Sequence, residues 1–343
     1  MPDARASVHP RWAVPGGVVR LEGTDLPLQA GGPPRVHVGG VQARVQSASP
    51  SRARLVVPAL DDDGWLPVQV EPGAIAAGDL LVARPVATGL HQVDSPAYDG
   101  LGRLYVTHSG SRGVKVPVPL YRVHADGARE PLAIDLPNPT SMALGPDGGM
   151  FVSSRFEGKV YRLAENDSVE VYASDLGVPT GLAFSRDGVL FVGDRSGSIL
   201  RVTRGREVDV FATLPASVAA FHLALGPDDC LYVSAPTLSA HDAIYRITPD
   251  RLVDTVYDGF GRPQGLAFDG DGVLYVAEAL AGASGIYRLD VSSPAPVPEL
   301  VVATPVVVGL AMDPVQGLVI ASNDTVWKLH APVSAAATRP LLP

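Results

Sequence analysis

The sequence predicts an all-β protein in which a six-bladed β-propeller follows a small N-terminal β-sandwich. A four-strand pattern recurs six times, and its aligned residues lie about 40–46 positions apart, at Tyr105, Phe151, Phe191, Tyr232, Tyr275 and Val319. The chain contains 36 glycines and 32 prolines, which favour many turns and therefore many short strands. Because a four-stranded sheet cannot bury both faces alone, such units pack on one another around a central channel.

Composition narrows the class of protein. With 46% hydrophobic and 18% charged residues, the 343-residue chain is typical of a folded globular protein. The formal net charge of −9 disfavours nucleic acid and anionic membranes as partners. The single cysteine, Cys230, excludes an internal disulfide framework and a zinc site built on several thiolates.

Nothing in the chain has the length and apolarity of a membrane span, which needs about 18 consecutive apolar residues. The first residues lack the apolar core of a signal peptide. We therefore expect a cytoplasmic protein, and secretion is the alternative if the chain is processed.

Residues 1–85 are predicted to form the sandwich. A strand at 16–23 precedes a hairpin at 35–45 that turns at Gly39-Gly40, and further strands are expected at 55–57 and 66–70. Short strands about ten residues apart are typical of a sandwich. The order of "VVRLEG", "VHVGGVQARV", "ARLVVP" and "LPVQV" resembles the TIG/IPT module, which implies an immunoglobulin-like fold.

Residues 86–335 are predicted to form the propeller, and residues 336–343 a C-terminal tail. Each unit has an inner strand, an Asp/Gly turn and a second strand, as in "LAFSRDGVLFV" and "LAFDGDGVLYV". A third strand follows in each unit, for example "LYRV" or "VYRL", and a fourth is visible in "VDVFATL". The arginine of the third strand recurs in nearly every unit, so we interpret it as part of the repeat structure.

The repeat resembles the NHL-repeat and gluconolactonase (senescence-marker) propellers over about residues 90–330. The resemblance implies a divalent metal at the channel, held by Glu, two Asn and Asp. Asp94 matches the glutamate, while Thr180 and Gln264 stand where the family has an amide and a carboxylate. No cofactor is therefore expected, and a divalent ion (Ca, Zn or Mn) on Asp94 is the alternative. The ending "YVAE" at Glu278 is also similar to streptogramin lyases.

The loops that precede the inner strands and those that follow the second strands open on one face of a propeller, around the channel. This face is where a rigid scaffold presents binding residues. We predict the following ligand-binding residues there: Arg112, Arg155, Arg195, Asp194, His108, Asn138, Thr140, Thr180 and Gln264.

Three of these residues are arginines that occupy the same point of successive units, at Arg112, Arg155 and Arg195. They form a half-ring that receives a carboxylate, phosphate or sulfate, or they pair between blades with Asp194 and Glu157. Both interpretations fit the sequence.

Candidate catalytic residues are His222, Asp242 and Glu278. His222 opens an inner strand, where its imidazole can reach the channel, and Asp242 is expected to orient it. The alternative is a structural, hydrogen-bonded histidine. No serine lies in a Gly-x-Ser-x-Gly elbow.

Three functions fit these features. The first is a ligand-binding propeller that takes a small anionic or polyhydroxyl molecule, or a protein segment, at the channel mouth. The second is a lactonase, hydrolase or lyase with an altered metal site, so enzymatic activity stays an open question. The third is an interaction protein. Neither nucleic acid nor a membrane is an expected partner.

Overall fold

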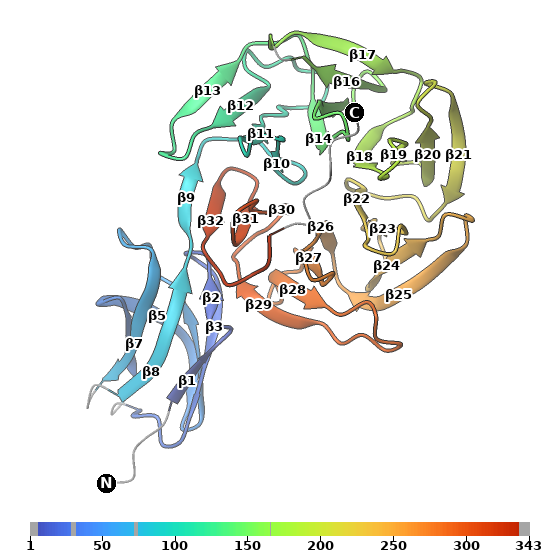
Figure 1. Cartoon of the computed structure of the whole chain (residues 1–343). Coiled ribbons are helices and arrows are strands. Elements are labelled where there is room, and N and C mark those ends of the chain that lie inside the picture. Colours follow the sequence, from blue (N-terminus) through green and yellow to red (C-terminus); the bar gives the residue numbers. More distant parts are fainter. Residues whose placement is uncertain (1–5, 29–31, 72–74, 165, 336–343) are drawn as a thin grey trace.

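The computed structural model describes residues 6–28, 32–71, 75–164 and 166–335, and in these ranges the only regular elements are β-strands. The predicted tail at 336–343 lies outside the described residues. Figure 1 shows a ring of sheets around a central axis, with the N-terminal strands attached to one side. No helix capable of spanning a membrane occurs in the described ranges.

Five separate four-stranded antiparallel sheets make up most of the ring, as the β-propeller prediction requires. The first two sheets are β10 (Ala97–Tyr98), β11 (Leu104–Thr107), β12 (Leu120–Val123) and β13 (Arg129–Leu132), followed by β14 (Pro139–Leu144), β15 (Met150–Ser154), β16 (Lys159–Leu163) and β17 (Val169–Ala173). The next two are β18 (Pro179–Phe184), β19 (Leu190–Asp194), β20 (Ser198–Val202) and β21 (Val208–Thr213), followed by β22 (His222–Leu225), β23 (Leu231–Ser234), β24 (Asp242–Ile247) and β25 (Val253–Phe260). The last consists of β30 (Gly309–Met312), β31 (Leu318–Ala321), β32 (Val326–Leu329) and β9 (Arg84–Ala87).

One predicted unit does not form a separate sheet, so the structure has five separate blades where the sequence predicted a six-bladed propeller. Its strands are β26 (Pro263–Phe268), β27 (Leu274–Glu278), β28 (Gly285–Leu289) and β29 (Glu299–Ala303). The short strand β2 (Trp12–Ala13) pairs in parallel with β29 on one side and with β8 (Ile75–Val82) on the other. The unit is therefore continuous with the N-terminal strands in one twelve-stranded sheet.

The N-terminal strands enclose a core of their own, centred on Leu21, Val36, Leu55, Val68 and Leu80. Strands 35–38 and 41–49 form the predicted hairpin, and both residues of its turn, Gly39 and Gly40, have positive φ. That backbone is the type I′ arrangement, which glycine adopts without steric cost. The strands are β1 (Ala6–His9), β3 (Val18–Gly23), β4 (Arg35–Val38), β5 (Val41–Ser49), β6 (Arg52–Val56), β7 (Gly64–Glu71) and β8 (Ile75–Val82).

Strand β9 closes the ring. It comes before the repeat units in sequence, yet it pairs with β32 near the end of the chain, through Ala87 with Val326 and Arg84 with Lys328. An apolar cluster that includes Ala87, Leu104 and Val319 packs the last sheet against the first. The strand crosses position 85, where the sequence placed the domain boundary, so Arg84 and Pro85 already belong to the propeller. Figure 1 shows β9 running from the N-terminal strands to the edge of β32.

A buried carboxylate also joins the first and last sheets. Asp313 accepts a hydrogen bond from the Tyr98 hydroxyl at 2.8 Å and forms an ion pair with Lys328 at 2.7 Å. Burial acts to raise the pKa of Asp313, but Lys328, backbone N–H groups and Tyr98 together hold that pKa below its ordinary value. The ionised carboxylate is thus part of the closure.

The third-strand arginines have the structural role that the sequence predicts. Their guanidinium groups pair with carboxylates on the outer strands or in turns between strands: Arg122 with Glu130 and Asp167, Arg162 with Asp147 and Glu170, Arg201 with Asp209, Arg246 with Asp254, and Arg288 with Glu299.

Replacing Asp313 tests the closure. Asp313→Asn is expected to lower the free energy of unfolding by about 3 kcal/mol at neutral pH, because Lys328 loses its carboxylate. A carboxylate with a lowered pKa stabilises the fold above its unfolded pKa and loses that effect as the pH falls. The difference from wild type should therefore shrink on acidification, as measured by urea unfolding across pH. The exposed Asp250→Asn is the control; a pH-independent difference for Asp313→Asn would contradict the assignment.

Replacing Gly17 tests the junction between the N-terminal strands and the propeller. A Cβ at Gly17 would lie 2.4 Å from the carbonyl oxygen of Ala303 in β29. Gly17→Ala should therefore destabilise the protein by about 1–3 kcal/mol in thermal or urea unfolding. Gly100→Ala is the matched control, because a Cβ there meets no atom within 4 Å. Equal stability of the two variants would show that the junction tolerates separation.

Candidate functional site

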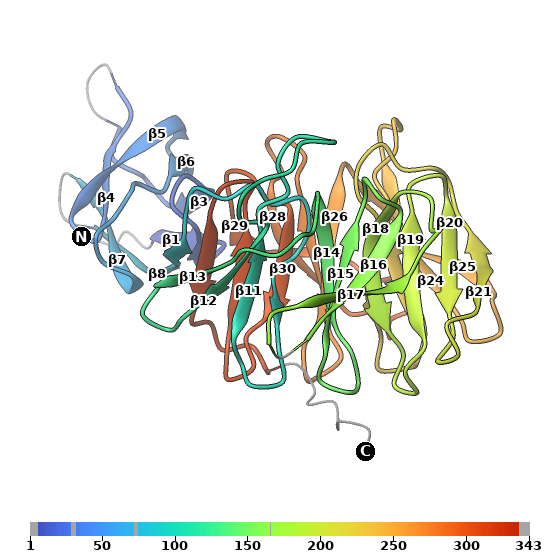
Figure 2. The ribbon, with the colours of Figure 1, turned by 90° about the horizontal axis from the view of Figure 1, so that it is seen from above.

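The three arginines named from the sequence lie on loops that follow second strands. Arg112 lies in the loop between β11 and β12, and Arg155 and Arg195 lie in the turns after β15 and β19. The edge-on view in Figure 2 shows how such loops project beyond the sheets. Arg112 is exposed, whereas the other two are half-buried.

None of the three arginines forms an ion pair in the part of the chain that the structure describes. Arg155 Nη2 donates to the carbonyl of Gly110 at 3.3 Å, and Arg195 Nη2 donates to that of Val218 at 3.0 Å. These are contacts to neutral acceptors, unlike the carboxylate pairs of the third-strand arginines. The arginine positions therefore keep their positive charge uncompensated.

The predicted pairing between blades is wrong, because both carboxylates are engaged elsewhere. Glu157 accepts a hydrogen bond from the Tyr161 hydroxyl and pairs with Lys159 at 3.6 Å. Asp194 accepts a bond from the backbone N–H of Val178 at 2.7 Å and another from the Ser196 hydroxyl. Each carboxylate thus organises its own turn.

The arginines are close enough to affect one another. Burial is the main cause that lowers the pKa of Arg155, and the positive charges of Arg195 and Arg112 lower it further. Two histidines extend the group: the rings of His91 and His108 have centroids 6.5 Å apart. The pKa of His91 is lowered by burial, by Arg155 and by His108. We call Arg112, Arg155, Arg195, His91 and His108 the cationic cluster.

Buried polar atoms with no partner among the described residues gather in this region. They are Nε of Arg155, Nε of Arg195, Nδ1 of His91 and Oγ of Ser109. Buried polar groups in proteins nearly always have a hydrogen-bond partner, so each exception calls for a specific reason.

Asn138 holds the loop that carries Arg112. Its side-chain oxygen accepts a bond from Gly113 N at 2.7 Å, and its amide nitrogen donates to the carbonyls of Ser109 and Ser111. The residue has a φ of 47°, a conformation that asparagine tolerates better than most residues. Asn138 is therefore an anchor beneath the cationic cluster, and it is fully buried.

A second network crosses the channel. His222 Nδ1 contacts the Asp94 carboxylate at 2.5 Å, and His222 Nε2 contacts the side-chain oxygen of Gln264 at 3.1 Å. The three residues start inner strands or precede them, and between 1% and 7% of their surface is exposed. The carboxylate that orients His222 is therefore Asp94, which corrects the sequence-based assignment of Asp242. With both ring nitrogens engaged, His222 is held as a buried cross-link.

The two predicted threonines are also buried, and both are bonded to the backbone. Thr180 Oγ1 donates to the carbonyl of Gly193 and accepts from Phe221 N at 3.0 Å, which joins β18 to the start of the next unit. Thr140 Oγ1 donates to the carbonyl of Asn138 at 3.3 Å. These two hydroxyls therefore stabilise the buried backbone around them.

Asp242 and Glu278 organise loops. Asp242 Oδ1 accepts bonds from the backbone and hydroxyl of Thr237, while its Oδ2 is buried without a partner among the described residues. Glu278 accepts bonds from the backbone N–H groups of Gly261, Arg262 and Leu280. Burial raises the pKa of Glu278, and those N–H groups act against the rise. Neither carboxylate contacts His222.

The donor set around Asp94 does not fit the metal that the family resemblance implies. Asp94 is its single carboxylate, and it is committed to Ser95 N and to His222. A hard cation such as calcium takes six to eight oxygen ligands. No group of three or more His, Cys, Asp or Glu side chains that could hold a metal occurs within the described ranges.

Sequence reasoning missed His91 as a member of the cationic cluster. His91 precedes the first recognisable repeat segment, so no aligned position draws attention to it. The structure brings it to the cluster because its backbone bridges His108, and Ser109 N donates to its carbonyl at 2.9 Å.

No family model and no curated protein matches the chain. Solved structures do resemble it in fold. A gluconolactonase-like protein has a TM-score of 0.59 at 16% identity, over 75% of this chain and 94% of that one. An auxiliary nutrient binding protein from Bacteroides ovatus has a TM-score of 0.56 at 12% identity, over 96% and 98%. Virginiamycin B lyase from Staphylococcus aureus has a TM-score of 0.52 at 13% identity, over 73% and 99%.

The anchoring role of Asn138 can be measured by hydrogen exchange. Asn138→Gly keeps the positive φ and removes the three side-chain hydrogen bonds, so amides of the 108–116 loop should exchange about tenfold faster. Asn138→Ala should have a larger effect, because alanine is also strained at this φ. Unchanged exchange in the glycine variant would contradict the anchor. Exchange in β19 serves as the internal control.

Proposed function

We propose that the protein is a ligand-binding propeller whose channel mouth takes an anion at the cationic cluster. The observation that carries this proposal is the set of three neighbouring arginines without a carboxylate partner in the described structure. Two of them bury an Nε atom that has no acceptor. An unsatisfied buried donor costs about 1–3 kcal/mol, and a bound oxyanion would remove that cost.

The ligand's anionic group suits the geometry of guanidinium. A carboxylate, phosphate or sulfate accepts paired, charge-assisted hydrogen bonds from arginine, and these bonds are stronger than neutral ones. In Arg155 and in Arg195, the Nη2 group donates a hydrogen bond to a backbone carbonyl, and this bond fixes the direction of the guanidinium plane. The remaining N–H groups are the ones we assign to the ligand.

Exposed apolar side chains stand beside the arginines and favour a ligand with an apolar body. Phe156 is 54% exposed next to Arg155, and Val114 is 54% exposed two residues after Arg112. Val218, whose carbonyl receives Arg195, is 37% exposed. Apolar ligand surface would be removed from water here. An anion with an apolar body, from a small molecule or an acidic protein segment, therefore fits better than a polyhydroxyl molecule.

The fold neighbours are compatible with this role. One is named as a nutrient binding protein and another as a lyase, so propellers of this shape serve both binding and catalysis. Because proteins that share a fold often differ in function, the function proposed for this protein rests on its site and not on its fold.

A lactonase, hydrolase or lyase is the second candidate, and the Asp94–His222 pair is the observation that favours it. A histidine with an orienting carboxylate is the usual start of base catalysis. In this arrangement the base would have to release Gln264 and become accessible, because only 1% of its surface is exposed. Turnover of a lactone panel that disappears in His222→Gln would establish it.

We also propose that the N-terminal strands are the immunoglobulin-like TIG/IPT module that their sequence resembles. Their core, which consists of buried apolar residues of the N-terminal strands and of Ala303 in β29, supports this proposal.

The anion proposal is tested with ligands that share a tail and differ in the head group. Octanoate and octyl phosphate should bind in calorimetry, and octyl glucoside should not. Arg155→Leu should weaken binding about tenfold or more, since a hydrogen bond to a charged group contributes about 1.5–3 kcal/mol. Arg186→Leu, on an arginine paired with Asp229 elsewhere, is the matched control. Equal binding of all three ligands, or an unchanged affinity in Arg155→Leu, would refute the proposal.

A further inference from the structure

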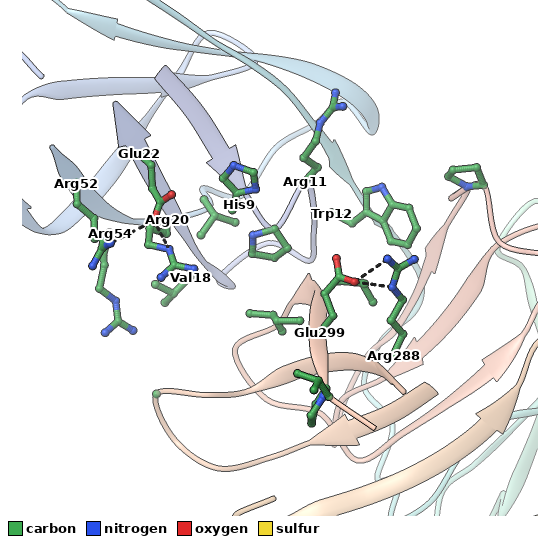
Figure 3. A pocket seen from close by; sticks show the side chains of 18 of the residues that line it. His9, Arg11, Trp12, Val18, Arg20, Glu22, Arg52, Arg54, Arg288 and Glu299 are labelled. Carbon is green, nitrogen blue, oxygen red and sulfur yellow. Dashed lines mark hydrogen bonds and ion pairs between the residues drawn. The ribbon is translucent and has the colours of Figure 1, made fainter. Parts of the chain in front are cut away.

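A cleft lies where the N-terminal strands meet the outer strands of the propeller. Its volume is about 1220 Å³. One wall is the outer face of β3 and β6, and the other is formed by β28, β29 and the residues before β29. Figure 3 shows Arg20, Arg52 and Arg54 on the first wall and the Arg288–Glu299 pair on the second. The cleft is separate from the channel mouth.

The lining is strongly basic in a protein of net charge −9. It holds five arginines and two glutamates: Arg11, Arg20, Arg52, Arg54, Arg288, Glu22 and Glu299. Glu22 forms ion pairs with Arg20 at 3.2 Å and with Arg52 at 3.5 Å, and Glu299 forms an ion pair with Arg288. Arg54 has no carboxylate partner within the described ranges. The walls therefore carry an excess of three positive charges.

Strand register places like charges directly opposite one another. Arg20 on β3 faces Arg54 on β6, and His9 on β1 faces Arg20 from the other side. Neighbouring strands are about 4.8 Å apart, so the row His9–Arg20–Arg54 spans about 10 Å. Like charges at directly opposed positions destabilise a sheet. A bound anion would turn this repulsion into attraction.

Aromatic side chains complete the cleft. Trp12 and Trp65 both line it, and Trp65 is 48% exposed. The guanidinium of Arg11 stacks over the Trp65 ring at 4.9 Å, which holds the ring in place. Flat apolar faces beside anion-binding groups suit a ligand that alternates ring faces with negative charges.

The strands that line the cleft restrict the kind of chain it can take. β2, β3, β6, β28 and β29 each pair with a neighbour on both sides, whereas β1, which contributes His9, ends the sheet. On the five fully paired strands a peptide backbone has no edge to which it could add, so recognition along both walls comes from side chains. We propose that this cleft binds a short anionic oligosaccharide, with its carboxylate or sulfate groups on the Arg20–Arg54 row and its rings against the tryptophans.

Calorimetry on the full chain tests the proposal with four probes of similar length. Trigalacturonate and a sulfated trisaccharide distinguish carboxylate from sulfate, maltotriose is the neutral control, and hexaglutamate represents an acidic peptide. One or both anionic saccharides should bind. Arg20→Gln/Arg54→Gln should weaken that binding at least about tenfold. The same double variant should raise the Tm of the unliganded protein, because it removes the opposed charges.

Matched variants separate this site from the channel mouth. Arg44→Gln changes an arginine on the neighbouring strand β5 that does not line the cleft, so affinity should be unchanged. Arg155→Leu should also leave saccharide binding intact. Loss of binding in Arg155→Leu, equal binding of maltotriose, tighter binding of hexaglutamate or absence of saccharide binding would each overturn the proposal.

Discussion

Closure of the ring is the constraint on which the rest of the structure depends. Each four-stranded sheet buries its faces only against its neighbours, so an open array would leave two apolar faces in water. Strand β9 and the Asp313 contacts join the last sheet to the first. Ring closure holds every loop on the channel face in a fixed relation to the others, and it brings residues from distant units, such as Asp94 and His222, into contact.

The same residue type has two roles in this protein, and the acceptors around it decide which. On the third strands, arginines face carboxylates of the outer edge and hold the sheets together. On the channel face, arginines meet only backbone carbonyls, and nearby carboxylates are occupied by turn amides. Positive charge is thus neutralised where it is structural and left available where the loops converge. The cleft beside the N-terminal strands combines both patterns, because Arg288 pairs with Glu299 whereas Arg54 has no carboxylate partner within the described ranges.

Buried polar residues at the channel form a closed hydrogen-bond network. His222, Asp94, Thr180 and Gln264 satisfy one another or the backbone, and they are almost fully enclosed. A network that is satisfied in this way makes the centre rigid. Arg155, Arg195, His91 and Ser109 are among the residues that bury a polar atom without a partner in the described structure. The groups that we propose to bind a ligand therefore lie outside this network, at the rim.

The sequence by itself determined the all-β class, the repeat period, the turn at Gly39-Gly40 and the common position of Arg112, Arg155 and Arg195. These are local or periodic properties, which the order of residues expresses directly. Only the tertiary structure decided that β2 merges one unit with the N-terminal strands, that His91 joins the cationic cluster, and that Asp94 rather than Asp242 orients His222. These contacts join residues far apart in the chain, and no local pattern encodes which carboxylate reaches which partner.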